Sequence, residues 1–464
     1  MPAERRPNFL FIITDDQSAA HTGKAGYMAV QTPNFDRLAN AGVYFENAFA
    51  AAPTCTASRS AILSGQHIWR LKSSALLWGA WSDVMFSYQT LLADNGYHTG
   101  YTGKGWGPGH AAPPGYLGQS YLDLNRELPA TYSQTDYVAN FRAFLDGALD
   151  DKPFSFWMGI REPHRPLKSD DRSRFDALTR DEYLPDHLPK IADVENPLQG
   201  YLEEIEQIDR DIGATITLLE EKNLLQNTLV VITSDNGMPF ARAKMNNYLL
   251  GVQVPLLVYW ENGMNGGRDV PQVISLTDVA PTFLAAAGLA IPPQMTGKNL
   301  LPLITGSSVE WHREEVYAGF ERHNYDARPE GMTHSRRSLH QQEWLYIRNY
   351  FPERWPLGDP PAYRDAYLSN LQDDASGEFL QPYLGYTVDK RPYEELYHLP
   401  TDPYQLDNLA YTSSGYEKLR ELAEKMDMEL SLTEDPVYLT GSDAFSRYEF
   451  WKPDSDAGTS PPAP

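Results

Sequence analysis

Short runs of consecutive apolar residues alternate along this chain with segments whose apolar positions recur every three or four residues. The continuous runs are polar on neither face, which is typical of parallel strands in a sheet covered by helices on both sides. Helical spacing extends over 32–42, which ends at a glycine, and over 200–225, which Asn227 follows. This alternation predicts an α/β fold with a large, mixed, mostly parallel sheet flanked by helices. The predicted strands are 8–14, 154–160, 228–234 and 255–260.

The pattern changes near residue 340. Residues 343–350 alternate between apolar and polar positions as an antiparallel strand does, and an amphipathic helix is predicted near 414–431. We therefore expect a larger α/β domain over 1–340, a smaller C-terminal α+β domain over 341–452, and a flexible tail over 453–464.

Acidic side chains outnumber basic ones by 62 to 39, which gives a formal net charge of −23. A chain this acidic argues against non-specific nucleic-acid binding, and any anion site in it has to be local and basic. No stretch approaches the roughly 20 apolar residues of a membrane span, so none is expected. The apolar run after Arg5 and Arg6 is too short for a signal peptide and fits a first strand better, so the residues predict no cellular location.

Oxygen-bearing side chains follow two of the predicted strands. Asp15 and Asp16 come directly after the first strand, and Asp235 and Asn236 after the strand at 228–234. Ligands of open α/β sheets bind beyond the carboxyl ends of the strands, and two such pairs suit Ca²⁺ or Mg²⁺. Either pair alone has an ordinary alternative, since Asp-Asn-Gly is a turn sequence and an Asp pair can cap a helix. The occurrence of two pairs favours the metal site.

The only cysteine, Cys55, precedes Arg59 by four residues, so on a helix the two lie on one face. A lone cysteine cannot form an intramolecular disulfide and is most simply a small buried apolar residue. Here it lies near the predicted start of a helix, where free backbone N–H groups and the helix dipole favour an anion.

Further cations are expected at the same edge of the sheet. The strand at 154–160 leads into His164, and Lys104 lies among glycines that let the backbone approach a ligand. Each residue alone is most simply a solvated loop residue. Together with Arg59 and Lys244, they indicate a site for a compact tetrahedral oxyanion, either sulfate or phosphate.

The segment CTASRSAILSG at 55–65 resembles the sulfatase signature, C-x-P/A-x-R followed by small and apolar residues and a glycine. The remaining motifs occur in that family's order, and together they extend from about residue 8 to residue 410. The chain is thus similar to the formylglycine-dependent sulfatases of the alkaline phosphatase superfamily, which implies an alkaline-phosphatase-like sheet. The motifs are TDDQ at 14–17, TGKG at 102–105, EPH at 162–164, TSDNG at 233–237 and ELYHLPTDPYQLDNLA at 395–410.

Within the family, three segments are most similar to the sulfamidase branch, the N-sulfoglucosamine sulfohydrolases. These segments are TSDNGMPFARAKMNNY at 233–248, SLTDVAPTFLAAAGL at 275–289 and SRRSLHQQEWLYIRNY at 335–350. The family also suggests a periplasmic or secreted location.

The resemblance implies a role for each candidate. A formylglycine-generating maturation enzyme would oxidise Cys55 to formylglycine, which is hydrated to a diol. One hydroxyl of the diol attacks sulfur, and deprotonation of the other then expels sulfate by C–O cleavage, an exit that a serine sulfate would lack. Arg59 would support the diol and Lys104 would bind sulfate oxygens, while His164 and Lys244 would lie at the leaving group, one as general acid. The ligands of Ca²⁺, or alternatively Mg²⁺, would be Asp15, Asp16, Asp235 and Asn236.

Two positions depart from the family pattern. Ala57 stands where many members have Pro, so the residues do not identify the maturation enzyme. Trp106 stands where many members have the His of a Lys-x-His motif, so one sulfate or leaving-group contact is expected to be missing. His110 is a possible replacement, although a solvated loop residue is the simpler interpretation.

The candidates for a saccharide subsite are His67, Trp78 and Trp81, from an aromatic-rich segment that follows the signature, and Arg337 near the domain boundary. Sugar rings stack on aromatic faces, but core packing is the simpler interpretation of each Trp.

The leading hypothesis is a Ca²⁺-dependent sulfatase that releases inorganic sulfate from a sulfated sugar or glycan by O–S or N–S cleavage. A phosphomonoester or phosphonate hydrolase on the same fold is one alternative. A non-catalytic metal- and glycan-binding protein with an unmodified Cys55 is another.

Overall fold

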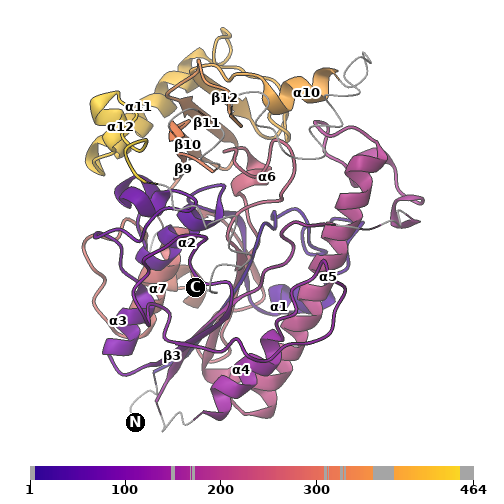
Figure 1. The fold of residues 1–464 in the computed structure, drawn as a ribbon, viewed down its shortest axis with the longest axis vertical. Coiled ribbons are helices and arrows are strands. Elements are labelled where there is room, and N and C mark those ends of the chain that lie inside the picture. Colours follow the sequence, from indigo (N-terminus) through magenta and orange to yellow (C-terminus); the bar gives the residue numbers. More distant parts are fainter. Residues whose placement is uncertain are drawn as a thin grey trace, which may run out of the picture.

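A computed structural model describes residues 6–449, except for 148–151, 168, 170–172, 308–310, 312, 324–327, 329–330 and 359–380. The tail expected over 453–464 lies outside the described residues. The structure is built on an eight-stranded sheet with the order β4-β3-β5-β1-β6-β7-β2-β8 (Figure 1). Its strands are β1 (Asn8–Thr14), β2 (Val43–Phe49), β3 (His98–Gly103), β4 (Gln119–Ser120), β5 (Phe154–Gly159), β6 (Thr228–Ser234), β7 (Leu256–Tyr259) and β8 (Arg268–Ser275).

Most strand pairs of this sheet are parallel. β1 pairs in parallel with both β5 and β6, β3 pairs in parallel with β4 and β5, and β2 pairs in parallel with β8. The large, mixed, mostly parallel sheet is therefore confirmed. The parallel orientation predicted for 255–260 is wrong, because β7 runs antiparallel to both β6 and β2. Residues 235–255 connect β6 to β7 and include the four-residue helix α6 (Leu249–Val252). An apolar run buried on both faces does not by itself show the direction of the strand.

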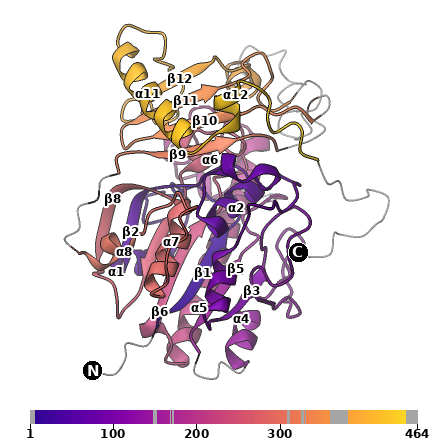
Figure 2. The same cartoon turned by 90° about the vertical axis from the view of Figure 1, so that its left-hand side faces the viewer.

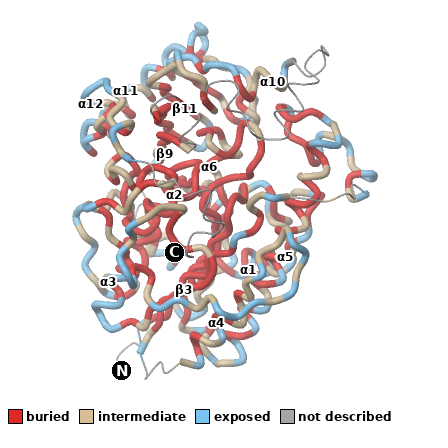
Figure 3. Tube along the Cα trace, viewed as in Figure 1, coloured by how far each residue is buried: buried red, intermediate tan, exposed pale blue. Residues whose placement is uncertain are grey.

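Side chains of β1 alternate between two hydrophobic cores, one on each face of the sheet. Leu10 and Ile12 pack with α1 (Pro33–Ala41), α4 (Tyr137–Asp146) and α5 (Ala192–Glu221). Phe9, Phe11 and Ile13 face α2 (Cys55–Ser64), α3 (Tyr88–Asp94) and α7 (Val279–Ala286). The strand is thus apolar throughout because both of its faces are buried, as Figure 3 shows for the centre of the molecule.

Helix α5 begins eight residues before its predicted start at Gly200. Pro197 and Gly200 both lie inside the helix. Proline removes one helical hydrogen bond there, while burial of the flanking Val194 and Leu198 favours a continuous helix.

A second, four-stranded sheet covers one end of the molecule, as Figure 2 shows. It is antiparallel throughout, and the antiparallel strand at 343–350 and the helix near 414–431 are confirmed. The sheet begins at Val316, so two of its strands precede residue 341, the expected start of the smaller domain. Its elements are β9 (Val316–Phe320), β10 (Arg336–His340), β11 (Trp344–Asn349) and β12 (Glu394–His398), with α10 (Gln381–Val388), α11 (Tyr416–Leu432) and α12 (Pro436–Thr440) nearby. The small helix α8 (Leu301–Thr305) precedes it.

The two sheets meet at the loop that leads into α2. Gly319 of β9 donates a backbone hydrogen bond of 2.9 Å to the carbonyl oxygen of Ala51. The second sheet therefore lies directly beside the start of the helix that carries Cys55. Among the described residues, no helix has both the length and the apolar character needed to cross a membrane.

Candidate active site

Three carboxylates meet at the carboxyl ends of two neighbouring strands. Thr14 of β1 pairs with Ser234 of β6, so the residues after these two strands emerge side by side. Carboxylate oxygens of Asp15, Asp16 and Asp235 lie within 4.8 Å of one another, and all three residues are buried. The parallel register thus brings together residues that are about half a chain apart.

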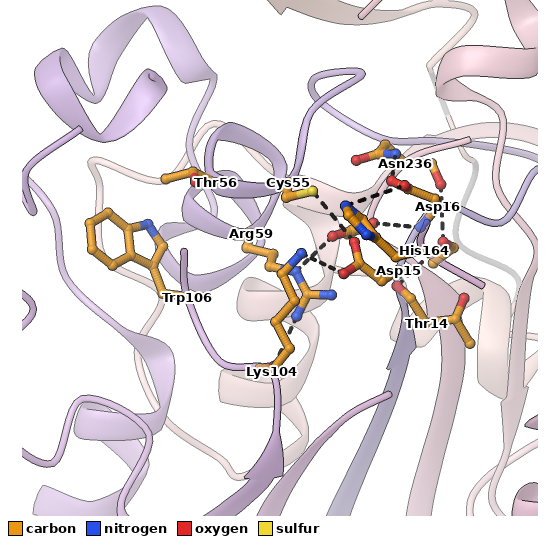
Figure 4. A network of polar contacts seen from close by, with 12 residues as sticks. Thr14, Asp15, Asp16, Cys55, Thr56, Arg59, Lys104, Trp106, His164 and Asn236 are labelled. Atoms are coloured by element: carbon orange, nitrogen blue, oxygen red, sulfur yellow. Dashed lines mark hydrogen bonds and ion pairs between the residues drawn. The ribbon is translucent and has the colours of Figure 1, made fainter. Parts of the chain in front are cut away.

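Each of these carboxylates contacts a cation of its own, and Figure 4 shows Asp15 with Lys104 nearby. Lys104 Nζ lies 2.5 Å from Asp15 and Arg59 Nε lies 2.7 Å from Asp235. Lys244 Nζ lies 2.6 Å from Asp16. Three negative charges this close repel one another strongly. The three cations therefore stabilise the cluster when no metal ion is bound.

The pKa values of Asp15 and Asp235 are shifted in opposite directions. Burial alone would raise the pKa of Asp15, but the charges of Lys104, His164, Arg59 and Lys244 hold that pKa well below its usual value. Burial and the charge of Asp15 raise the pKa of Asp235 to about 6, against the opposing effect of Arg59. The negative charge of Asp15 therefore disfavours ionisation of Asp235. Added positive charge would stabilise both carboxylates in their ionised form.

Asn236 offers a further oxygen to this cluster. Its Nδ2 donates a hydrogen bond of 2.6 Å to Asp16 Oδ1, while its buried Oδ1 has no partner among the described residues. A buried oxygen without a partner is unusual and costly. Three carboxylates and a free amide oxygen form the hard donor set that Ca²⁺ and Mg²⁺ prefer, so these residues fit such an ion.

Cys55 is the first residue of α2 and its thiol faces the carboxylates. The thiol donates a hydrogen bond of 3.4 Å to Asp15 Oδ1. Burial, aided by the charge of Asp15, raises the pKa of Cys55 to about 12. The side chain is therefore a protonated thiol at neutral pH, which is a poor nucleophile. All ten residues of α2 are buried, which its small side chains permit.

Arg59 lies one turn after Cys55 and is completely buried. Its Nη1 donates to the carbonyl oxygens of Lys104 at 2.9 Å and Gly105 at 3.1 Å. Its Nη2 has no partner among the described residues. Arg59 thus connects α2, the Lys104 loop and Asp235, and retains a donor for a ligand.

Two cavities open from the cluster, and His164 and Arg165 lie in the walls of both. The smaller, of about 200 Å³, is lined by Asp16 and Lys244 among others. The larger, of about 620 Å³, is lined by Asp15 and Lys104 among others. All nine residues predicted for metal binding and catalysis are therefore brought together, in the carboxylate cluster, in direct contact with it, or in the walls of these cavities.

His323 also lines the smaller cavity and was missed by the sequence analysis. It follows β9 of the second sheet, and its Nδ1 is hydrogen-bonded at 2.7 Å to Oγ1 of Thr54, the residue before Cys55. Burial, aided by the charge of Lys244, holds the pKa of His323 well below its usual value. No motif marks this histidine, because it reaches the site only through the packing of the second sheet on α2.

The indole of Trp106 points away from Cys55 (Figure 4). Its Nε1 donates a hydrogen bond of 2.6 Å to Ser60 Oγ on α2. His110 lines neither cavity of the site. Trp106 lines the larger cavity, but its ring nitrogen donates to Ser60, so neither residue supplies the contact expected from the His of a Lys-x-His motif.

None of the four side chains expected to form a saccharide subsite lines either cavity. His67 stacks on Trp69 and lies 2.9 Å from Glu429, and Trp81 packs against the Trp106 ring. Arg337 is 1% exposed and forms ion pairs with Glu321 and Asp435. Trp78 is half-buried and donates its backbone N–H to the carbonyl oxygen of Pro108. The structure thus does not bring these four side chains to the site.

Replacement of Arg337 tests its structural role. We expect Arg337→Met to destabilise the protein by about 3 kcal/mol, because it leaves two buried carboxylates without a cation. The measurement is urea unfolding followed by circular dichroism and by tryptophan fluorescence. Unchanged stability would contradict this structural role.

Comparison with known proteins gives consistent matches. The Sulfatase family model matches residues 7–289, and the model named N-sulphoglucosamine sulphohydrolase, C-terminal, matches residues 243–383. An ulvan-active sulfatase of Formosa agariphila is 25% identical over 477 residues, which cover 95% of this chain and 78% of that protein. The N-sulphoglucosamine sulphohydrolase of Homo sapiens is 26% identical over 464 residues, covering 90% and 88%.

A solved structure shares the fold. It is that of a protein in complex with its substrate, D-glucosamine-2-N,6-O-disulfate, and it aligns with a TM-score of 0.63 at 19% identity. The alignment covers 93% of this chain and 99% of that one.

Proposed function

Because the chain belongs to the sulfatase family, we propose that it releases inorganic sulfate from a sulfated saccharide. The family makes it a hydrolase of sulfuric esters or sulfamates. The observation that carries the proposal is the position of Cys55, which faces three carboxylates among Arg59, Lys104 and Lys244. The saccharide is supported by relatives whose names specify ulvan and N-sulphoglucosamine.

Asp15, Asp16, Asp235 and Asn236 would hold a divalent cation, with Ca²⁺ favoured by the all-oxygen donor set. When present, the cation would neutralise charge on the sulfate oxygens, and a formylglycine formed from Cys55 would supply the nucleophilic hydroxyl. Arg59 would orient residue 55, since it lies one turn away and is fixed by three acceptors. Formation of formylglycine needs a maturation enzyme, which is part of this proposal.

Lys104 and Lys244 would bind the sulfate oxygens. Each ammonium group has three donors, so it can keep its carboxylate partner and also donate to an oxygen of the substrate. Fixed positive charge of this kind stabilises the transferring sulfuryl group without rearrangement during the reaction.

His164 and Lys244 are the candidates for protonating the leaving group. The Nδ1 of His164 donates a hydrogen bond of 2.8 Å to the carbonyl oxygen of Arg165, and its Nε2 lies 3.8 Å from Asp16. This arrangement leaves Nε2 as the atom directed at the cluster. The charge of Lys244 and burial lower the pKa of His164, which makes its protonated form a stronger acid.

Leaving-group dependence distinguishes the two candidates. If His164 is the acid, His164→Ala is expected to lower kcat/KM about 100-fold for a sugar sulfate and less than about tenfold for 4-nitrophenyl sulfate, whose leaving group needs no proton. The same pair of assays on Lys244→Ala shows whether the lysine has this role instead. Equal losses on both substrates would contradict an acid role for the residue replaced.

The function is tested with matched substrates. The protein, co-expressed with a formylglycine-generating enzyme, is assayed with glucosamine-2-N-sulfate, glucosamine-6-O-sulfate, 4-nitrophenyl phosphate and phenyl phosphonate esters, and the released anions are measured by ion chromatography. We expect sulfate release from a saccharide to dominate. Preferential phosphate or phosphonate hydrolysis would replace the proposal with the alternative hydrolase.

Maturation is tested by the mass of the tryptic peptide Leu38–Arg59, in which an aldehyde replaces the thiol. A fully converted protein that releases no anion would contradict the proposed function. An unmodified thiol in the protein's native host would support a non-catalytic binding protein.

A further inference from the structure

The larger cavity of the active site contains a carboxyl group that the proposed mechanism does not use. Glu204 of α5 lines this cavity, together with Tyr132 and Ser133 from the segment that precedes α4. Asp15 and Lys104, which would lie at the sulfate, line the same cavity. His164, a candidate acid for the leaving group, lines both cavities of the site, but the larger has about 620 Å³ against about 200 Å³ for the smaller. The larger cavity therefore has more room for the sugar of a substrate whose sulfate contacts Lys104.

Glu204 has an unused hydrogen-bonding atom. The residue is 2% exposed, and its Oε2 has no partner among the described residues. Glu162 lies in the same wall, and each of its carboxyl oxygens has a hydrogen-bond partner. Its Oε1 accepts from Ser133 N at 2.7 Å and its Oε2 accepts from Tyr137 Oη at 2.9 Å. A buried oxygen without a partner is costly, and a ligand in this cavity can provide the missing partner.

The protonation state of Glu204 determines which ligand groups can form hydrogen bonds with it. Burial, aided by the charges of Glu162 and Glu203, raises the pKa of Glu204 to about 9. At neutral pH the group is therefore a neutral carboxyl, with one O–H donor and one acceptor oxygen. A hydroxyl is likewise both donor and acceptor, so the two groups are complementary.

We propose that Glu204 binds a hydroxyl group of the sugar that carries the sulfate, which makes the larger cavity the saccharide subsite. This inference rests on the proposed function and specifies where its substrate is recognised. Tyr132 lines the same cavity and provides an aromatic face on which a sugar ring can stack. In this proposal Glu204 is a specificity residue that contacts the sugar, while Lys104 and Lys244 contact the sulfate.

The test compares a substrate that has ring hydroxyls with one that has none. For the wild type, Glu204→Leu and Glu204→Gln, kcat/KM is measured on the sulfated glucosamine that is hydrolysed best and on 4-nitrophenyl sulfate. In Glu204→Leu we expect the ratio of the two kcat/KM values to fall about tenfold, mainly through a higher KM for the saccharide. In Glu204→Gln, whose amide is neutral and keeps both donor and acceptor, the ratio is expected to stay within about threefold of the wild type.

Glu220→Gln is the matched control on the same helix. Glu220 is exposed and does not line the cavity, so its replacement should leave the ratio unchanged. An unchanged ratio in Glu204→Leu would overturn the inference, and so would an equal fall in Glu204→Gln. If Glu204→Leu does not fold, Glu204→Ala is measured under the same criterion. Failure of the proposed function is distinguishable, because the wild type would then hydrolyse neither sulfate.

Discussion

A Cys55→Ala protein is expected to fold normally and to lose sulfate-releasing activity by about 10,000-fold or more, because the residue that becomes the nucleophile is gone. Alanine is a strong helix former and fits the fully buried start of α2. The thiol's hydrogen bond to Asp15 is weak and long, at 3.4 Å, so its loss has little effect on stability. The measurements are kcat on 4-nitrophenyl sulfate and thermal unfolding of both proteins.

Ser58→Ala is the matched control for this experiment. Ser58 lies on the same helix, and its buried hydroxyl has no partner among the described residues. Its removal should change neither activity nor stability appreciably. Retention of more than about 1% of wild-type activity in Cys55→Ala, well above what the binding groups alone supply, would contradict the formylglycine mechanism.

The second large effect is expected at Asp235. Asp235→Asn removes one charge from the cluster of three carboxylates while its amide oxygen remains an acceptor for Arg59. We expect affinity for Ca²⁺ to fall about 100-fold or more and kcat to fall about 1,000-fold, because charge on the ligands largely sets the affinity of a hard cation. Metal content after dialysis, Ca²⁺ titration calorimetry and sulfate release are the measurements.

Asparagine is preferable to alanine at this position, because alanine would leave the completely buried Arg59 without its ion-pair partner. Asp209→Asn is the control. Asp209 is a buried carboxylate that accepts hydrogen bonds from Asn34 and Phe35 at the start of α1, so its replacement should alter stability but not metal binding. Wild-type Ca²⁺ affinity in Asp235→Asn would remove Asp235 from the set of ligands.

Local pattern alone predicted the elements that carry the candidate metal site. A strand buried on both faces has to be apolar throughout, so β1, β5 and β6 were recognisable with nearly correct bounds. Polar residues that directly follow such strands lie at one edge of a parallel sheet. Asp15, Asp16, Asp235 and Asn236 could therefore be grouped from the sequence, although the register of β1 on β6 that brings them into contact is a tertiary feature.

Features that depend on how distant segments pack were not predictable in this way. The apolar run of β7 has the same appearance in either direction, so its antiparallel pairing with β6 and β2 is a tertiary feature. The start of α5 depends on burial that outweighs Pro197. Aromatic richness suggested Trp78 and Trp81 as saccharide contacts, but composition does not show which face of a segment meets the cavity.

His323 and Glu204 are single polar residues in no recognised motif. The first reaches the site because the second sheet packs beside α2, and the second because α5 borders the larger cavity. Residue patterns along the chain were thus enough to identify the buried strands, the residues at their ends and the family signature, because each of these features is local in sequence. Which other side chains line the cavities became clear from the structure, because it depends on the packing of elements that are remote in sequence.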